Sequence, residues 1–145
     1  MKFIKASISD ISLLMDMIES FYEEDNHNYD EEKIYNALLE LITHEDYGAI
    51  FLIESSNKYV GYFILSYGWS LEYFGRDAFI DEIFINKEFR GKGLGKKTIN
   101  FMETYLKDKK IKTIHLEVNK YNIAKKLYES KGYITHNSHL MSKKL

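Results

Sequence analysis

The sequence predicts one α/β domain, spanning residues 1–145, that is built on a mixed β-sheet. A chain of 145 residues suffices for one buried core, and its 45% apolar and 29% charged residues are globular values. Runs of β-forming residues are interspersed with segments whose apolar residues recur at helical spacing. No proline, internal repeat or low-complexity tract interrupts this pattern, so we expect no hinge or linker.

The chain should begin with a strand and a helix. Lys2–Ala6 is a short β-forming run. Ser9 or Asp10 can cap the next helix, whose apolar positions from Ile11 to Tyr22 have a helical period. This helix should end in the acidic stretch 23–26.

A second helix and three strands should follow. Carboxylates at positions 30–32 suit the positive end of a helix, and an apolar stripe runs from Ile34 to Ile42. Ala49–Glu54 and Tyr59–Tyr67 are expected to form a hairpin. Ala78–Ile85 is a third β-rich run and is apolar except for two adjacent acids.

The C-terminal part should contribute two more helices and two more strands. Leu94–Lys107 has a helical stripe, Thr113–Val118 is a predicted strand, and Ile123–Ser130 is a predicted helix. Lys131-Gly132 should terminate that helix, and Tyr133–Leu140 should close the domain as a strand. The complete predicted order is β-α-α-β-β-β-α-β-α-β.

Composition excludes several classes of protein. No stretch approaches the roughly 20 apolar residues of a membrane span, and the N-terminus lacks the apolar core of a signal peptide. The absence of cysteine excludes disulfides, a thiol nucleophile and thiolate zinc sites. We therefore expect a cytoplasmic protein that does not associate with membranes.

Charge is distributed unevenly along the chain. Residues 1–57 carry three lysines against thirteen carboxylates, whereas residues 58–145 carry seventeen basic residues against nine acidic ones. Solvated helix faces can account for many of these charges. The segregation also suits a polyanionic ligand on the basic part and a cation on the acidic part. A net charge of −2 makes nucleic acid a poor candidate.

A glycine-rich loop separates the third β-rich run from the next helix. Arg90-Gly91-Lys92-Gly93-Leu94-Gly95 lets backbone N–H groups converge on an anion without obstruction by a Cβ. The positive end of the helix and the side chains of Lys96 and Lys97 add to the attraction for phosphates. A tight turn with solvated lysines is the purely structural alternative.

Two other phosphate loops fit this segment poorly. A Walker A loop needs a glycine five positions before its Gly-Lys pair, where this chain has Arg90, and a Ser or Thr after the lysine, where it has Lys97. A Rossmann fingerprint needs a third glycine where this chain has Lys96, and it needs a preceding βαβ unit.

The run from Phe84 to Gly95 resembles the acyl-CoA motif Gln/Arg-x-x-Gly-x-Gly/Ala of the GNAT superfamily, with Arg90, Gly93 and Gly95 at its defining positions. A second block resembles the motif that follows in that family. Its residues are Asn119, Asn122, Ala124, Leu127-Tyr128-Glu129 and Lys131-Gly132-Tyr133. The resemblance implies a GNAT fold, in which about four helices flank a mixed, mostly antiparallel sheet.

The resemblance also implies acetyl-CoA as the donor and a role in N-acetyl transfer. The pantetheine arm should lie against the backbone of Ile83, Phe84 and Ile85, and the pyrophosphate should lie on residues 90–96. Asn122 can cap the following helix, and in the family this asparagine also touches the pantetheine arm, so we group Asn122 and Asn119 with the donor site. Dimers are common in the family, so a homodimer is expected.

Amine acetylation requires a base for the amine and an acid for the departing thiolate. Tyr128 resembles the tyrosine that many family members place near the CoA sulfur, although it could simply pack in the core. Asp81 and Glu82 are the candidate bases, and neighbouring strand residues face opposite sides, so only one should face the cleft. We favour Glu82; a structural salt bridge to Arg76 or Arg90 is the alternative.

The acceptor side is less well defined. Segments 22–30 and 67–76 would flank the acceptor pocket in a GNAT fold, which makes Tyr22, Glu24, Trp69 and Tyr73 the candidate contacts. Aromatic rings beside acids suit a protonated amine. We expect a small amine such as a polyamine, an aminoglycoside or an amino compound. The run 75–82 resembles a segment of uncharacterised bacterial GNAT proteins, and this resemblance does not identify the substrate.

Two further functions stay open from the sequence. The acceptor could be a protein N-terminus or lysine, or the chain could be an acyl-CoA-binding regulatory module without turnover. We expect no metal site, because His136 and His139 on a strand would face opposite sides.

Overall fold

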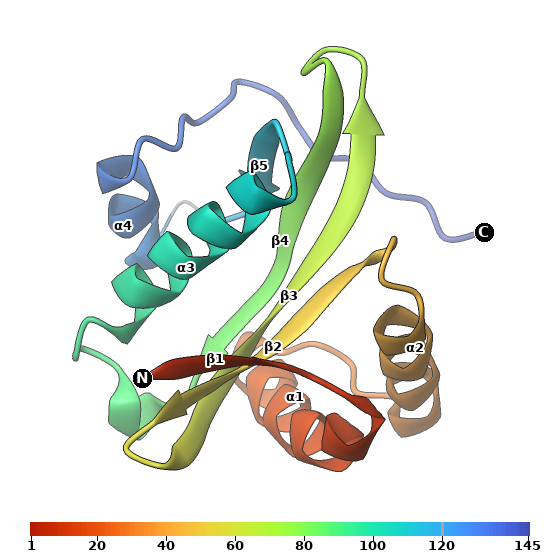
Figure 1. The fold of residues 1–145 in the computed structure, drawn as a ribbon, viewed down its shortest axis with the longest axis vertical. Coiled ribbons are helices and arrows are strands. Elements are labelled where there is room, and N and C mark those ends of the chain that lie inside the picture. The colour runs from red at the N-terminus through yellow and green to blue at the C-terminus, as the bar shows by residue number, and fades with distance from the viewer. Residues whose placement is uncertain (120) are drawn as a thin grey trace.

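The computed structural model describes residues 1–119 and 121–145. In these residues five strands form one sheet in the order β1-β2-β3-β4-β5 (Figure 1). The strands are β1 (Lys2–Lys5), β2 (Gly48–Ser55), β3 (Lys58–Ser70), β4 (Gly75–Ile85) and β5 (Thr113–Leu116). Neighbouring strands are antiparallel except β4 and β5, which are parallel, and this confirms the predicted mixed, mostly antiparallel sheet.

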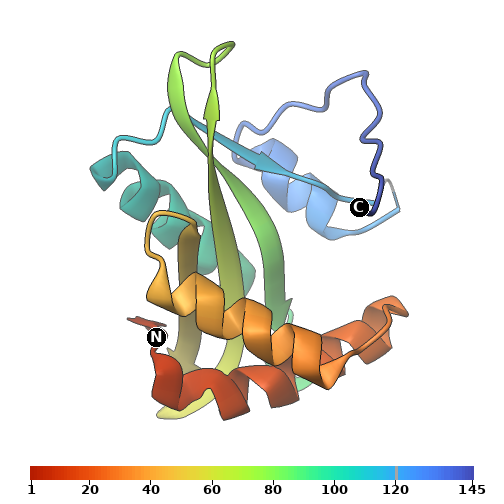
Figure 2. The ribbon, with the colours of Figure 1, turned by 90° about the vertical axis from the view of Figure 1, so that its right-hand side faces the viewer.

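Four α-helices flank the sheet: α1 (Ile11–Asp25), α2 (Glu31–Thr43), α3 (Leu94–Asp108) and α4 (Ala124–Ser130). Helices α1 and α2 cover one face, and α3 covers the other (Figure 2). The N-terminal end of α3 contacts α4, because a Cβ on Gly95 would lie 3.4 Å from Leu127 Cδ2. Among the described residues, no helix is long and apolar enough to cross a membrane.

The two cores explain why β2, β3 and β4 are apolar on both faces. Ile50 and Leu52 of β2 pack in the core under α1 and α2. Ala49, Phe51 and Ile53 alternate with them and pack in the core under α3. A sheet covered on both sides therefore needs continuous apolar runs, which is what the sequence shows.

The predicted final strand is wrong. Tyr133–Leu140 has no regular secondary structure, and its residues after Tyr133 are exposed. A strand is stabilised by the ladder of a neighbouring strand. In the described part of the chain, β5 is the edge of the sheet and pairs only with β4.

The hairpin between β3 and β4 is longer than predicted. The strands continue to Ser70 and resume at Gly75, so residues expected to form a loop pair as Gly68↔Asp77 and Trp69↔Arg76. The hairpin projects beyond the helices at the top of Figure 1. This end of the hairpin covers no core, because Trp69, Leu71 and Phe74 are largely exposed, so its strands lack the burial pattern that would predict them.

Strand β4 contains one extra residue in its middle. Ile64 pairs with Glu82, but Leu65 pairs with Ile80, so Asp81 has no partner on β3. This is a β-bulge, which bends the strand and changes the alternation of its side chains. The bulge lies where β4 and β5 separate.

Candidate acyl-CoA and acceptor site

Strands β4 and β5 diverge and leave one edge of β4 open. Their parallel register runs from Asp77↔Thr113 to Ile80↔Leu116, and β5 ends there. The second half of β4, residues 81–85, therefore continues without a described partner on that side. This gap lies between the bulge and the glycine loop.

The open edge presents backbone groups for a ligand. Asn86 N–H donates to Val60 O, which identifies the register position next to Ile85 as a hydrogen-bonded pair. Pairs alternate along an antiparallel ladder, so the N–H and C=O groups of Ile83 and Ile85 point away from β3. Of the backbone positions predicted to hold the donor, Ile83 and Ile85 thus expose polar groups, whereas the side chain of Phe84 is buried under α1.

A short 3-10 helix (Lys87–Phe89) follows β4, and the glycine loop then leads into α3. Gly91 and Gly93 both have φ of 75°, a left-handed conformation that favours glycine. A Cβ at either position would meet no atom within 4 Å, so the space outside the loop is open to a ligand. Leu94 is buried and anchors the loop to the core under α3.

The positive end of α3 faces the same loop. Gly93 is its N-cap residue, and no side chain caps the helix. Its first-turn N–H groups can therefore bind an anion. Lys92 and Lys96 are exposed; the Lys92 ammonium donates to Glu88 O at 2.9 Å and lies 5.2 Å from the Phe89 ring centre. These features fit a diphosphate.

Arg90 points toward α1 rather than toward this helix end. One of its Nη atoms donates to Glu24 Oε2 at 2.8 Å, and its Nε donates to Ile85 O at 2.6 Å. Its guanidinium also lies 5.6 Å from the Phe84 ring centre. Glu24, which was predicted to contact the acceptor, is thus held by Arg90, and Lys87 lies 3.6 Å from its other oxygen.

Glu82 is enclosed by two tyrosines on the face under α1. The Tyr22 hydroxyl donates to Oε1 at 2.9 Å, and the Tyr62 hydroxyl donates to Oε2 at 2.7 Å. Burial raises the pKa of Glu82, and the two phenol hydrogen bonds oppose that rise. Burial and the neighbouring Glu82 carboxylate raise the pKa of both tyrosines, which keeps them protonated. Neither arginine proposed as a salt-bridge partner contacts Glu82 in the described residues.

Asp81 is the accessible carboxylate of the pair. It is exposed, and it makes no hydrogen bond or ion pair with any described residue. Partial burial of its carboxyl nevertheless raises its pKa above the ordinary value. The negative charge of Asp81 is also one of the causes that raise the pKa of the neighbouring Glu82.

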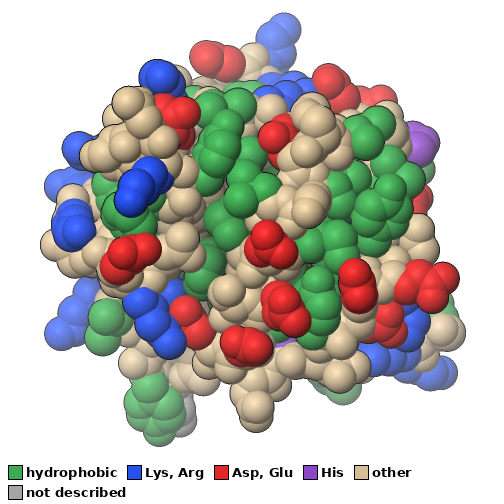
Figure 3. Space-filling view, turned by 90° about the horizontal axis from the view of Figure 1, so that it is seen from below, with side chains coloured by type: hydrophobic (Ala, Val, Ile, Leu, Met, Phe, Trp, Pro, Cys, Tyr) green, Lys and Arg blue, Asp and Glu red, His purple; other side chains and the backbone are tan. Residues whose placement is uncertain are grey.

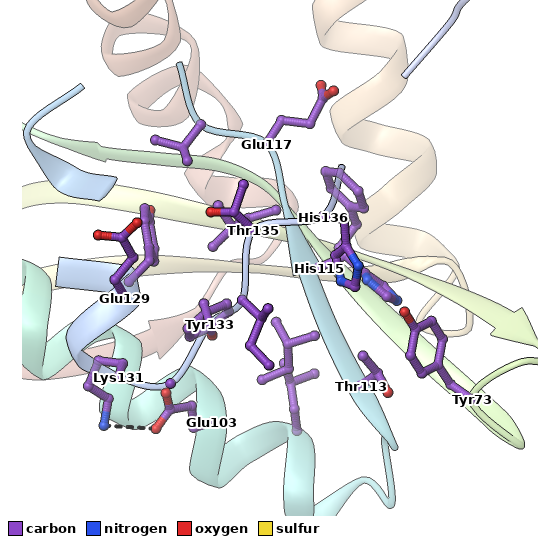
Figure 4. Close-up of a pocket in the computed structure, with 18 of the residues that line it drawn as sticks. Tyr73, Glu103, Thr113, His115, Glu117, Glu129, Lys131, Tyr133, Thr135 and His136 are labelled. Carbon is purple, nitrogen blue, oxygen red and sulfur yellow. Dashed lines mark ion pairs between the residues drawn. The ribbon is translucent and has the colours of Figure 1, made fainter. Parts of the chain in front are cut away.

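Tyr128 lies on α4 and lines a cavity of about 910 Å³. The cavity is bounded by β5, α4 and the C-terminal segment, and it includes residues 116–118, where β5 leaves β4 (Figure 4). Tyr128 is 7% exposed, and burial raises its pKa. Its ring packs against Tyr133, and no described contact joins it to Asp81 or Glu82.

The two asparagines shape the turn between β5 and α4. Asn119 Oδ1 accepts from Tyr121 N–H, and Asn122 Oδ1 accepts from Ala124 N–H, next to the start of α4. Asn122 thus bonds the backbone two residues on, whereas the N-cap residue of α4 is Ile123, without a side-chain cap. Both side chains are exposed.

Trp69 and Tyr73 lie on the projecting hairpin, away from the glycine loop. Trp69 is 75% exposed. Tyr73 packs against His115, whose Nε2 lies 3.3 Å from Asp77 Oδ2, and this group borders the cavity beside β5. Among the predicted acceptor contacts, only Tyr22 reaches the acid pair directly.

Sequence reasoning missed Tyr62 and the pair Asp77–His115. Tyr62 is fully buried within an apolar strand, so nothing in the sequence distinguishes its hydroxyl from those of the other tyrosines. The Asp77–His115 pair depends on the parallel register of β4 and β5. In that register His115 lies opposite Phe79, two residues after Asp77 on the same strand. Among the described residues, no group of three or more His, Cys, Asp or Glu side chains could hold a metal.

The acidic and basic parts of the chain occupy different regions of the surface. Figure 3 shows carboxylates beside apolar side chains across the middle and right of one face, and a group of Lys and Arg side chains at its left margin. The acidic surplus of residues 1–57 comes mainly from α1, α2 and their connection. The N-terminal and C-terminal parts of the chain thus differ in charge.

Comparison with known proteins identifies the fold. The sequence model of the acetyltransferase (GNAT) family matches residues 12–133. The structure is similar to an integron cassette protein from the mobile metagenome of Cole Harbour Salt Marsh, with 26% identity, a TM-score of 0.88, and coverage of 99% of this chain and 90% of that one. No curated protein sequence matches the chain.

Two clostridial structures share the fold at lower identity. A possible acetyltransferase from Clostridium difficile 630 has 22% identity and a TM-score of 0.86, with 99% of this chain and 97% of that chain covered. A predicted acetyltransferase from Clostridium acetobutylicum, solved with acetyl-CoA, has 15% identity and a TM-score of 0.82, with 98% and 95% covered. The family match over most of the chain, together with the glycine loop and the split between β4 and β5, shows that the chain belongs to the GNAT family and is an acetyl-CoA-dependent acyltransferase.

Proposed function

We propose that the chain transfers the acetyl group of acetyl-CoA directly to a primary amine, and that the acceptor is a small cationic molecule. The observation that carries this proposal is Asp81, an accessible carboxylate without a partner among the described residues, located where β4 separates from β5. Asp81 is on the same strand that leads toward the glycine loop, and it adjoins Glu82, which is hydrogen-bonded to Tyr22 of α1. It can receive a proton from an amine that arrives from the acidic side.

The residues around the gap fit the donor. The outward-facing backbone groups of Ile83 and the N–H of Ile85 would hold the pantetheine amides, since Ile85 O already accepts from Arg90 Nε. Residues 90–96 with the first turn of α3 would hold the pyrophosphate. The donor supplies an activated acetyl group as a thioester. Asn119 and Asn122 would border the pantetheine arm from the turn before α4.

Two side chains would handle the protons. Asp81 accepts a proton from the ammonium group, which frees the nitrogen lone pair to form the new C–N bond. Tyr128 donates its phenolic proton to the sulfur as the C–S bond breaks, and water restores that proton. The raised pKa of Asp81 brings its basicity closer to neutrality, which favours this role. A chain without cysteine cannot use a thiol acyl-enzyme, so direct attack is preferred.

Glu82 would hold in place the C-terminal end of α1, which borders the proposed acceptor site, rather than act as the base. Both of its oxygens already accept phenol hydrogen bonds, from Tyr22 of α1 and Tyr62 of β3. This arrangement holds the end of α1 against β4 beside Asp81. Tyr22 would then present its ring to a protonated amine, and the acidic surface of α1 would attract it.

A second candidate is an acyl-CoA-binding module without turnover. The observation that favours it is the separation of Tyr128, which packs with Tyr133, from the acid pair. A module of this kind would bind CoA through the same loop but would not release free thiol with any amine.

The deciding experiment is a thiol-release assay with acetyl-CoA and a panel of polyamines, aminoglycosides, amino acids and peptides. We expect turnover with a small cationic amine, and we expect Tyr128→Phe to reduce kcat by about 10²-fold while the Kd for CoA changes little. Turnover with peptides alone would overturn the proposed acceptor. CoA binding without thiol release from any amine would favour the binding module.

A further inference from the structure

The only arginine of the glycine loop, Arg90, is held by a carboxylate from the opposite side of the site. Glu24 accepts from an Arg90 Nη atom at 2.8 Å through Oε2, and Lys87 Nζ lies 3.6 Å from its Oε1. The Glu24 side chain is 22% exposed, whereas that of Arg90 is 44% exposed. One glutamate thus pairs with two cations that adjoin the predicted pyrophosphate site.

The remaining contacts of Arg90 hold it at the end of β4. Its Nε donates to Ile85 O, one of the outward-facing groups of the open strand edge, and its guanidinium lies over Phe84. In this position Nε of Arg90 is hydrogen-bonded to β4, on the side where CoA is predicted to bind, while one of its Nη atoms pairs with Glu24 of α1. A diphosphate on Gly91–Lys96 would be a competing partner for the same guanidinium, since Arg binds phosphate and carboxylate with the same planar donors.

We infer that Glu24 is a positioning residue that competes with the pyrophosphate for Arg90, so that donor binding releases the C-terminal end of α1. This inference rests on the proposed function, because it requires CoA on the glycine loop. The same helix turn carries Tyr22, whose hydroxyl is bonded to Glu82. When Glu24 is released, the Tyr22–Glu82 hydrogen bond still joins this end of α1 to the acid pair. Binding of CoA would therefore change the position of the part of α1 that borders the proposed acceptor site.

The test measures CoA affinity directly by isothermal titration calorimetry. Glu24→Gln keeps the size of the side chain and removes its charge, so Arg90 becomes available to the phosphates. We expect CoA to bind about two- to fivefold more tightly, which is the range of a partly exposed ion pair. Glu23→Gln is the matched control: it removes the same charge one residue away, where no ion pair is formed among the described residues, and it should change the Kd much less.

A double-mutant cycle assigns the effect to Arg90. Arg90→Gln should weaken CoA binding, and Glu24→Gln added to it should give no further gain. Equal CoA affinity of wild type and Glu24→Gln, or an equal gain from Glu23→Gln, would overturn the competition. Thermal unfolding of each variant shows whether it is folded. If wild type itself does not bind CoA, the proposed function fails, whereas binding with unchanged variants overturns this inference alone.

Discussion

At the scale of single residues, one extra residue in β4 divides the roles of two adjacent acids. Regular alternation would place Asp81 and Glu82 on opposite faces of the sheet. The bulge instead leaves Asp81 unpaired with β3 and exposed, while Glu82 is enclosed by two phenols. The sequence interpretation favoured Glu82 as the base, and the geometry gives the better case for Asp81.

Replacement of the accessible acid should therefore abolish most of the activity. We expect Asp81→Asn to lower kcat/KM by about 10²- to 10⁴-fold, because the amide cannot accept the ammonium proton. In wild type, kcat/KM should rise with pH through the raised pKa of Asp81, since the base acts only when it is deprotonated. A pH–rate profile measures both. Glu82→Gln is the comparison, and a larger loss there than in Asp81→Asn would return the base role to Glu82.

The same replacement should stabilise the fold at neutral pH. Because burial raises the pKa of Asp81 in the folded state, its contribution to stability is largest when it is protonated and decreases as pH rises through that pKa. Asp81→Asn removes a partly buried charge that has no partner among the described residues. Its Tm should exceed that of wild type at about pH 7, and the difference should disappear near about pH 4, close to the usual range of aspartate. A lower Tm than wild type at neutral pH would show that Asp81 has a stabilising partner.

At the scale of elements, the loop between β4 and α3 combines two kinds of glycine. Gly91 and Gly93 have positive φ and open space around them, whereas Gly95 lies inside the helix against Leu127. The first two permit the left-handed backbone and leave space in which we propose that the phosphates bind, whereas the third permits the packing of α3 on α4. The family pattern, which allows Gly or Ala at the third position, agrees with this difference.

Two alanine substitutions should separate these roles. Gly93→Ala places a Cβ in a left-handed conformation at a cost of about 1–2 kcal/mol, and the added methyl group lies where the phosphate would approach. Its affinity for CoA should fall by about tenfold or more. Gly95→Ala makes an ordinary contact with Leu127 and should bind CoA within about twofold of wild type. Calorimetric titration measures both affinities, and equal losses in the two variants would argue against a ligand at Gly93.

At the scale of the whole molecule, the sheet separates two surfaces of opposite charge. The acidic helices α1 and α2 cover one face, and the basic loop and α3 lie at the other side of β4. Under the proposed function, an anionic donor and a cationic acceptor would approach from different sides and meet where β4 and β5 separate. The overall charge of −2 conceals this arrangement.

Salt should weaken binding on both sides. Raising the NaCl concentration from about 50 mM to about 500 mM shortens the screening length from more than 10 Å to less than 5 Å, so the Kd for CoA and the KM for a cationic amine should both increase. Pantetheine lacks the phosphates, and its binding should change little. Titration and steady-state assays at both concentrations check this. A CoA affinity that does not depend on salt would contradict a charged phosphate site.

The sequence by itself determined the fold class and the order of the elements as far as α4, and it predicted the glycine loop as the donor site. It could do so because periodicity, glycines and cations are local signals that a strand–loop–helix unit needs wherever it occurs. The tertiary structure alone decided three features: the bulge at Asp81, the enclosure of Glu82 by Tyr22 and Tyr62, and the capture of Arg90 by Glu24. These depend on strand register and on contacts between residues 20 to 66 positions apart, which no local pattern records. The same reason explains why residues 133–140 do not form the predicted final strand. A strand forms only where a neighbouring strand can hydrogen-bond to it.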